Sequence, residues 1–220
     1  MKRWLSIIGA GDDGLAGLAP AARALVDGAE IIIASRRLFG RDAAALAGKE
    51  LVEWASPLSE TIARMAAWRG RKVAVLASGD PMHFGIGCTL ARRFAPDEMA
   101  VVPAPSAFSL AAARLAWPLQ AVEQIWLHCR AAELLIPFIA PRARILALTS
   151  GAATIGKAAD FPRERGLRPS RLTLLEHLGG ESERIVPLRA DAIGGPPRAE
   201  PNQHPLQRVP ARGAAIVSCV

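Results

Sequence analysis

Short apolar runs alternate with longer amphipathic stretches through the first half of the chain. Each run is long enough for a buried strand, and the runs cover residues 5–8, 31–34, 51–54, 73–77 and 99–102. The stretches between them predict helices over residues 20–28, 41–49, 59–68, 86–94 and 106–115. Pro20 suits the first turn of the first helix, and Ser59 and Ser106 are expected to cap two others. This alternation predicts a mostly parallel sheet with helices on its faces.

The Trp117-Pro118 dipeptide interrupts the alternation and indicates a boundary between two lobes. We therefore expect two α/β lobes, residues 1–116 and 117–220. In the second lobe the pattern predicts strands at residues 124–128, 144–149 and 171–176, and helices near residues 133–139 and 152–159. From Pro187 onward, repeated prolines predict an irregular tail, in which only residues 214–217 suit a strand.

Composition places the chain among globular proteins. Its 220 residues are 51% hydrophobic, which is ample for a core, and no apolar stretch is long enough to span a bilayer. Asp12 and Asp13 interrupt the apolar start too early for a signal sequence. The three cysteines (Cys88, Cys129 and Cys219) lack CxxC spacing, which argues against a disulfide framework or a metal site, and Cys88 is expected to be a small buried side chain. These features favour a reduced, cytoplasmic setting without membrane contact.

The net charge of +7 raises the question of an anionic partner. Nucleic-acid binding is disfavoured, because the basic residues are scattered in ones and twos and no tyrosine lies among them. A small substrate rich in carboxylates explains scattered arginines through bidentate pairing. A genome of high GC content, which encodes Arg in place of Lys, explains most of the excess without any partner.

The segment from Ser78 to Gly87 carries the clearest signal for a ligand. A buried strand ends there in Gly79-Asp-Pro, and Gly79, Gly85 and Gly87 allow unusual dihedrals and a close approach to a bound molecule. Ligands of open α/β sheets bind beyond the carboxyl ends of the strands, where this loop falls. His83 is a candidate for acid–base work or substrate contact, although closing the turn explains it equally well. Asp80 is expected to hold the shape of the loop rather than act as a catalyst.

A second glycine motif, Gly9-Ala-Gly-Asp-Asp-Gly14, matches the dinucleotide-binding fingerprint. The repulsion between its two carboxylates and a diphosphate would cost more free energy than a helix dipole contributes, which is roughly 0.3–1 kcal/mol per charge. The next helix also begins late, at about Pro20. Residues 35–37 (Ser-Arg-Arg) suit a 2′-phosphate, so an NADP-dependent oxidoreductase remains the alternative hypothesis. Asp12 and Asp13 either assist proton removal or cap the turn, and we favour capping.

Four segments of the chain resemble the tetrapyrrole (corrin/porphyrin) methyltransferases: residues 5–15, 77–87, 102–115 and 127–130. They occur in the order and spacing of that family, and residues 146–151 and 172–184 extend the resemblance to roughly residues 3–185. Within the family, the chain is most similar to the modules that methylate carbon 5 of a precorrin in cobalamin biosynthesis.

The resemblance implies two α/β lobes, with a mostly parallel sheet in the first, a mixed sheet in the second and S-adenosylmethionine in a cleft between them. It also implies a homodimer. Contacts of the family to this cofactor map onto Gly79, Asp80, Pro81, Met82, His83, Ser106, Ala107, Thr149 and Leu178. Because the cofactor carries the reactivity, catalysis needs mainly proximity, and the catalytic candidates are His83 and Asp80.

The acceptor implied by the resemblance is a large anionic precorrin-type tetrapyrrole. In this family the first glycine loop faces the acceptor, which here involves Gly11 and Asp12. His128 and Arg130 follow a predicted strand and are candidates to grip acceptor carboxylates, although a surface pair at a strand end explains them equally well.

The chain departs from the family in three respects. Cys129 stands where the family usually has glycine, and no final strand is recognisable in the proline-rich tail. Many relatives carry a second module for carbon-15 methylation and decarboxylation, which we expect to be absent here or supplied by a separate partner protein. A catalytically weakened, tetrapyrrole-binding remnant is therefore a further alternative.

Overall fold

The computed structural model describes residues 3–149, 151–167, 170–189 and 213–218. The chain divides at Ser106–Ala107 into two compact units. This boundary lies earlier than the expected one at Trp117, because helix α5 (Ala107–Leu115) packs with the second unit. Its apolar side chains, Phe108 among them, are buried against the second sheet.

The first unit contains a five-stranded sheet in the order β3-β2-β4-β1-β5. All its strand pairs are parallel, so all five carboxyl ends lie at one edge, as the alternating pattern predicted. The strands are β1 (Leu5–Ala10), β2 (Ile31–Ala34), β3 (Glu50–Glu53), β4 (Val73–Ser78) and β5 (Met99–Val102).

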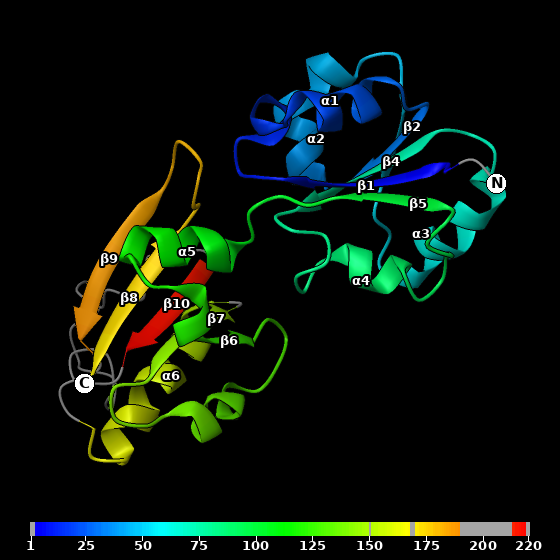
Figure 1. Cartoon of the computed structure of the whole chain (residues 1–220). Coiled ribbons are helices and arrows are strands. Elements are labelled where there is room, and N and C mark those ends of the chain that lie inside the picture. Colours follow the sequence, from blue (N-terminus) through cyan, green and yellow to red (C-terminus); the bar gives the residue numbers. More distant parts are fainter. Residues whose placement is uncertain (1–2, 150, 168–169, 190–212, 219–220) are drawn as a thin grey trace. The chain divides into compact units, whose positions relative to one another are not determined.

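Helices cover both faces of the first sheet, as Figure 1 shows. On one face, α1 (Pro20–Asp27) and α2 (Arg36–Asp42) pack against Ile32 and its neighbours. On the other, α3 (Leu58–Met65) and α4 (Ile86–Leu90) pack against Ile31 and Ile33. Because alternate side chains of β2 face opposite helix layers, a continuous apolar run is the pattern that this strand requires. Short 3₁₀ helices supplement the elements of the chain: η1 (Gly14–Gly17), η2 (Ala43–Leu46), η3 (Ala66–Trp68), η4 (Leu119–Ala121) and η5 (Ala132–Phe138).

Helix ends account for the main errors of the sequence prediction in the first unit. The helix expected over residues 41–49 begins earlier, as α2, and continues as η2. Ser59 is no cap, because Pro57 occupies the N-cap position of α3 with an extended backbone and Ser59 falls inside the first turn. The helix expected over residues 86–94 is shorter in the structure, where the α-helix ends at Leu90.

The second unit contains a mixed sheet in the order β6-β7-β10-β8-β9. β6 and β7 are parallel, and the other neighbours are antiparallel, as expected. One face packs against α6 (Ala152–Glu164) and η5, and the other packs against α5. The strands are β6 (Glu123–Trp126), β7 (Arg144–Thr149), β8 (Arg171–Glu176), β9 (Arg184–Arg189) and β10 (Gly213–Ser218).

The prediction of an irregular tail from Pro187 is wrong for the start of the tail, whereas the strand that the sequence allowed at residues 214–217 is confirmed as β10. Pro187 lies within β9, at the edge of the sheet, where a strand tolerates a residue without an N–H. β10 is the central strand of the second sheet and pairs with both β7 and β8. It supplies the final strand of the family, which was not recognised as such in the sequence, and the prolines at positions 196–210 lie outside the described residues.

The described residues contain neither a membrane-spanning helix nor a metal-binding cluster. No helix there combines the length and the apolar character needed to cross a bilayer. No group of three or more His, Cys, Asp or Glu side chains in the described ranges is placed to hold a metal ion.

Candidate functional site

Strands β1 and β4 are neighbours, and the chain leaves them in opposite directions across the first sheet (Figure 1). From β1 the chain passes to β2, beyond β4, whereas from β4 it passes to β5, beyond β1. Ligands of open α/β sheets bind outside the carboxyl ends of the strands at such a switch point. The candidate site of the first unit is therefore the edge at which the loops after β1 and β4 emerge.

Gly9, near the end of β1, is where three segments of this edge converge. A Cβ built on Gly9 would lie 2.6 Å from the carbonyl oxygen of Gly79 and 2.7 Å from the Cβ of Ala104. The backbone N–H of Gly79 also donates to the carbonyl oxygen of Ala10 at 2.8 Å. Gly9 is thus required for the close packing of the two loops, a role that needs no dinucleotide.

The loop from Gly79 to Gly87, which we call the ligand loop, folds back over two of its glycines. A Cβ on Gly85 would lie 2.5 Å from the carbonyl oxygen of Asp80, and one on Gly87 would lie 2.7 Å from that of Pro81. Of the three glycines only Gly79 has a positive φ, of 69°. Close packing, rather than unusual dihedrals, therefore explains Gly85 and Gly87.

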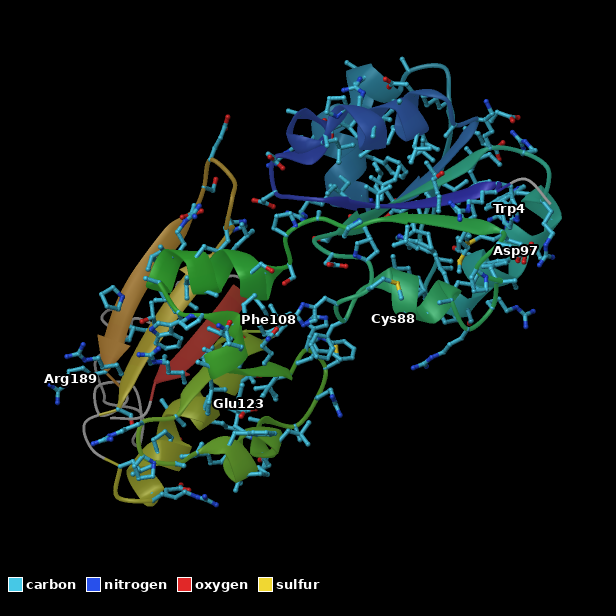
Figure 2. All side chains as sticks on the ribbon, in the orientation of Figure 1. Trp4, Cys88, Asp97, Phe108, Glu123 and Arg189 are labelled. Carbon is cyan, nitrogen blue, oxygen red and sulfur yellow. The ribbon has the colours of Figure 1, made fainter. Side chains whose placement is uncertain are left out.

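Two side chains fasten the ligand loop. The Oδ1 atom of Asp80 accepts a hydrogen bond from the backbone N–H of Met82 at 2.8 Å, which confirms the expected contact of Asp80 with the loop backbone. The thiol of Cys88 donates to the carbonyl oxygen of Met82 at 3.0 Å. Cys88, labelled on α4 in Figure 2, is only partly buried, so its interpretation as a small buried side chain is wrong.

His83 connects the ligand loop to the segment that follows β5. Its Nδ1 atom lies 3.1 Å from the Oγ of Ser106, a buried serine directly before α5. The ring of Phe84 stacks on that of His83, with the centroids 5.0 Å apart. Phe84 has a φ of 55°, and the side chains of both Phe84 and Met82 are more than 40% exposed. A partly exposed aromatic residue with a strained backbone in a ligand loop favours a role in binding. The sequence analysis assigned no role to Phe84.

The first glycine loop is tied to α2 by acidic and basic side chains. Asp12 forms an ion pair with Arg37, whose Nη2 atom also donates to the Oγ of Ser78 at 3.1 Å. Asp13 stands before η1 without a side-chain cap hydrogen bond, so the structure does not support the favoured capping role for Asp13. Gly11 lies beside Asp13, because a Cβ there would come within 2.5 Å of the Oδ1 of Asp13.

The NADP alternative depended on Arg36 and Arg37. Arg37 pairs with Asp12, and the Nε of Arg36 lies 3.2 Å from the Oε2 of Glu53. The first α-helix after the glycine turn begins only at Pro20, beyond η1. The turn therefore does not lead directly into an α-helix that would receive a pyrophosphate.

The predicted site residues of the second unit lie at one edge of its sheet. β6, β7 and β8 run in the same direction, so their carboxyl ends share that edge. Thr149 ends β7 and is buried, and His128 and Arg130 follow β6. Leu178 follows β8 and is buried against α5. The structure thus brings these four residues to the same edge, while Cys129 adopts a φ of 56° there.

A charged clamp holds the turn that contains Leu178. The Oε2 of Glu183 accepts from the N–H of Gly179 at 2.7 Å, and Arg114 of α5 donates to both carboxylate oxygens, at 2.5 and 2.9 Å. The hydrogen bonds from Arg114, followed by that from Gly179, lower the pKa of Glu183 to about 2. The clamp therefore stays charged at neutral pH and fixes the turn to α5. The sequence contained no signal for the contact of Arg114 with Glu183, because these two residues are 69 positions apart along the chain.

Comparison with known proteins gives consistent results for most of the chain. Residues 5–193 match the family model described as Tetrapyrrole (Corrin/Porphyrin) Methylases. A Sinorhizobium protein named precorrin-6Y C(5,15)-methyltransferase (decarboxylating) is 44% identical over 183 residues, which are 83% of this chain and 44% of that protein. The cobalt-precorrin-7 C(5)-methyltransferase of Salmonella typhimurium is 26% identical over 192 residues, 86% of this chain and 92% of that protein.

A solved structure shares the fold along nearly the whole chain. The cobalamin biosynthesis precorrin-6Y methylase from Archaeoglobus fulgidus aligns with a TM-score of 0.62 at 28% identity, covering 97% of this chain and 96% of that one. The chain thus spans less than half the length of the Sinorhizobium relative, but nearly all of two shorter ones.

Proposed function

The chain belongs to the tetrapyrrole (corrin/porphyrin) methylase family, and on that basis we propose that it transfers a methyl group from S-adenosylmethionine to a precorrin in cobalamin biosynthesis. The observation that carries the proposal is the ligand loop, folded tightly at the switch point of the first sheet and joined through His83 to Ser106. The names of the similar proteins from Sinorhizobium, Salmonella and Archaeoglobus support the same chemistry.

Carbon 5 of the macrocycle is the proposed position of methylation. The Salmonella relative, which the chain matches over 92% of its length, is named for carbon 5 alone. The match to the protein named for carbons 5 and 15 covers only 44% of that protein. In this proposal residues 5–193 carry the carbon-5 reaction, and carbon-15 methylation with decarboxylation is carried by residues outside them.

The residues of the first unit fit S-adenosylmethionine. The backbone over Gly85 and Gly87 is packed too closely for added side chains, so the loop has a fixed shape to present to a ligand. The exposed parts of Met82 and Phe84 offer apolar surface for an adenine ring. The proposed cofactor contacts here are Gly79, Asp80, Pro81, Met82, His83 and Ser106, and those of the second unit, Ala107, Thr149 and Leu178, remain predictions from the family.

The bound cofactor supplies an activated methyl group, so the protein needs chiefly to hold the acceptor carbon in line with it. His83 is the proposed acid–base residue, because the contact of its Nδ1 with Ser106 fixes the orientation of the ring within the ligand loop. Asp80 is proposed to hold the loop through Met82. His128 and Arg130 are proposed acceptor contacts, and a homodimer in the cytoplasm is the proposed state of the protein.

Binding measurements separate this function from the oxidoreductase alternative. We expect S-adenosylhomocysteine to bind with a 1:1 stoichiometry in isothermal titration calorimetry and to raise the melting temperature, whereas NADP does neither. Binding of NADP without binding of S-adenosylhomocysteine would overturn the proposal. Cofactor binding without methylation of any precorrin would instead favour the non-catalytic remnant, although β10 supplies the strand whose apparent absence suggested it.

A further inference from the structure

Three side chains from separate segments meet at the switch point of the first sheet. Asp12 lies two residues beyond β1, Arg37 lies in α2 just beyond β2, and Ser78 ends β4. Because β2, β4 and β1 are adjacent in the sheet, these segments emerge side by side. Resting on the function proposed above, we propose that Arg37 binds a carboxylate of the tetrapyrrole acceptor, and that Asp12 and Ser78 hold its guanidinium ready.

The contacts of Arg37 leave most of its hydrogen-bond donors for a ligand. Nη1 donates to one oxygen of Asp12 and Nη2 donates to the neutral hydroxyl of Ser78, so two of the five N–H groups are used within the described residues. Arg114, in contrast, engages both carboxylate oxygens of Glu183. Arg37 thus lacks the bidentate pairing with a carboxylate that its planar guanidinium favours.

Solvent exposure makes the remaining N–H groups of Arg37 accessible to a ligand. The side chain of Arg37 is 52% exposed, whereas that of Asp12 is 12% exposed. An incoming carboxylate can therefore reach the N–H groups that Asp12 and Ser78 do not use. The guanidinium stays paired with Asp12, which fixes its orientation while the acceptor binds.

Arg36 provides a matched control on the same helix. It carries the same charge one residue away, but its side chain is 86% exposed and pairs with Glu53 at the end of β3. A general attraction of the basic surface for anions would involve Arg36 and Arg37 equally. A specific carboxylate-binding site at the switch point would depend on Arg37 and not on Arg36.

The test uses the full chain with uroporphyrin, a porphyrin whose side chains all end in carboxylates, and with its fully methyl-esterified form. Quenching of porphyrin fluorescence gives the Kd for Arg37→Gln, Arg36→Gln and Asp12→Asn, and calorimetry gives the Kd of S-adenosylhomocysteine. We expect Arg37→Gln to weaken uroporphyrin binding about 10-fold or more, because hydrogen bonds to charged groups contribute that much. Arg36→Gln should change it less than about 2-fold. Asp12→Asn should strengthen it, because Asn keeps an oxygen acceptor for Arg37 and removes a negative charge beside the acceptor carboxylate.

Binding of S-adenosylhomocysteine should be unchanged in all three variants, which keeps this test separate from that of the cofactor site. Equal weakening by Arg36→Gln and Arg37→Gln, or no weakening by Arg37→Gln, would overturn the proposal. Equal binding of the esterified porphyrin would do the same, because carboxylates would then not be recognised. Failure of S-adenosylhomocysteine to bind the unaltered chain would count against the proposed function and not against the role of Arg37.

Discussion

Gly9 and Gly79 approach so closely that a Cβ on Gly9 would lie 2.6 Å from the carbonyl oxygen of Gly79. This contact joins the end of β1 to the ligand loop, and Ala104 closes it from the other side at 2.7 Å. The proposed cofactor site therefore depends on a glycine outside the ligand loop itself.

We predict that Gly9→Ala lowers the stability by about 1–3 kcal/mol, which is the usual cost of adding a methyl group to a close-packed place. It should also weaken the binding of S-adenosylhomocysteine, because Gly79 must move. Denaturant unfolding and calorimetry measure the two effects. Gly40→Ala is the control, since a Cβ there meets nothing within 4 Å and the residue lies in α2. Equal effects of the two substitutions would refute the packing argument.

The Asp80 side chain is predicted to act through its hydrogen bond to Met82. Asp80→Ala removes this bond and should weaken the binding of S-adenosylhomocysteine about 5-fold or more, in proportion to the roughly 1 kcal/mol that such a bond contributes. Asp80→Asn keeps an oxygen acceptor and should bind nearly as well as the unaltered chain. If Asn is as damaging as Ala, the charge of Asp80 matters and the purely structural role is wrong.

His83 is predicted to affect turnover more than cofactor binding. His83→Gln should lower kcat by about 10²–10⁴-fold, the range typical of a lost acid–base group, while the Kd of S-adenosylhomocysteine changes only a few-fold. Ser106→Ala removes the contact that orients the ring and should produce a smaller loss of kcat. A His83→Gln variant with full kcat would show that the histidine only closes the turn.

Glu98 is predicted to make the stability of the first unit depend on acid pH. Hydrogen bonds from Arg69, then Trp4, then the backbone of Ala95 lower the pKa of its carboxyl group from 4.5 to about 2. Since the folded-state pKa is depressed, the stabilisation is fully present above about pH 4.5 and is lost as the pH falls toward 2. Glu98→Gln should be less stable at neutral pH and should lose less stability across that window.

Unfolding free energies measured between pH 2 and 7 test the role of Glu98, with Glu60→Gln on the exposed side of α3 as the control. Part of the pH dependence should survive in Glu98→Gln, because the pKa of Glu183 is also lowered to about 2. An unchanged slope in Glu98→Gln would contradict the assignment.

Cys129 is predicted to store strain, because its φ of 56° lies in the left-handed region. That conformation costs a residue with a Cβ about 1–2 kcal/mol, whereas glycine adopts it freely. After the greater entropy of glycine in the unfolded chain is subtracted, Cys129→Gly should stabilise the protein by about 0.5–1 kcal/mol. Cys129→Ala keeps the strain and should not stabilise it, and equal stabilities for Gly and Ala would contradict the argument.

The sequence predicted the strands of the first unit well and the ends of its helices poorly. Runs such as residues 31–34 are apolar on both faces because helices cover both faces of β2, and such a run has few other interpretations. The start of α3 depends on the backbone at Pro57, and nothing in the pattern distinguishes this from a cap at Ser59. The pattern allowed a strand at residues 214–217 but did not show its central place in the sheet, because that place comes from pairing with β7 and β8, which are distant in the sequence.

The candidate site was predictable only where its residues are consecutive. The ligand loop and the bond of Asp80 to Met82 follow from a local motif. The pairing of Arg37 with Asp12 depends on the order of the strands, which no local pattern contains.

Transfer of a labelled methyl group tests the central claim most directly. The chain is incubated with S-adenosylmethionine carrying ¹³C in its methyl group and with a precorrin that lacks the carbon-5 methyl, and the product is examined by NMR. We predict one labelled methyl group, attached to carbon 5. Label at another carbon, or an unlabelled macrocycle from protein that binds S-adenosylhomocysteine, would contradict the account.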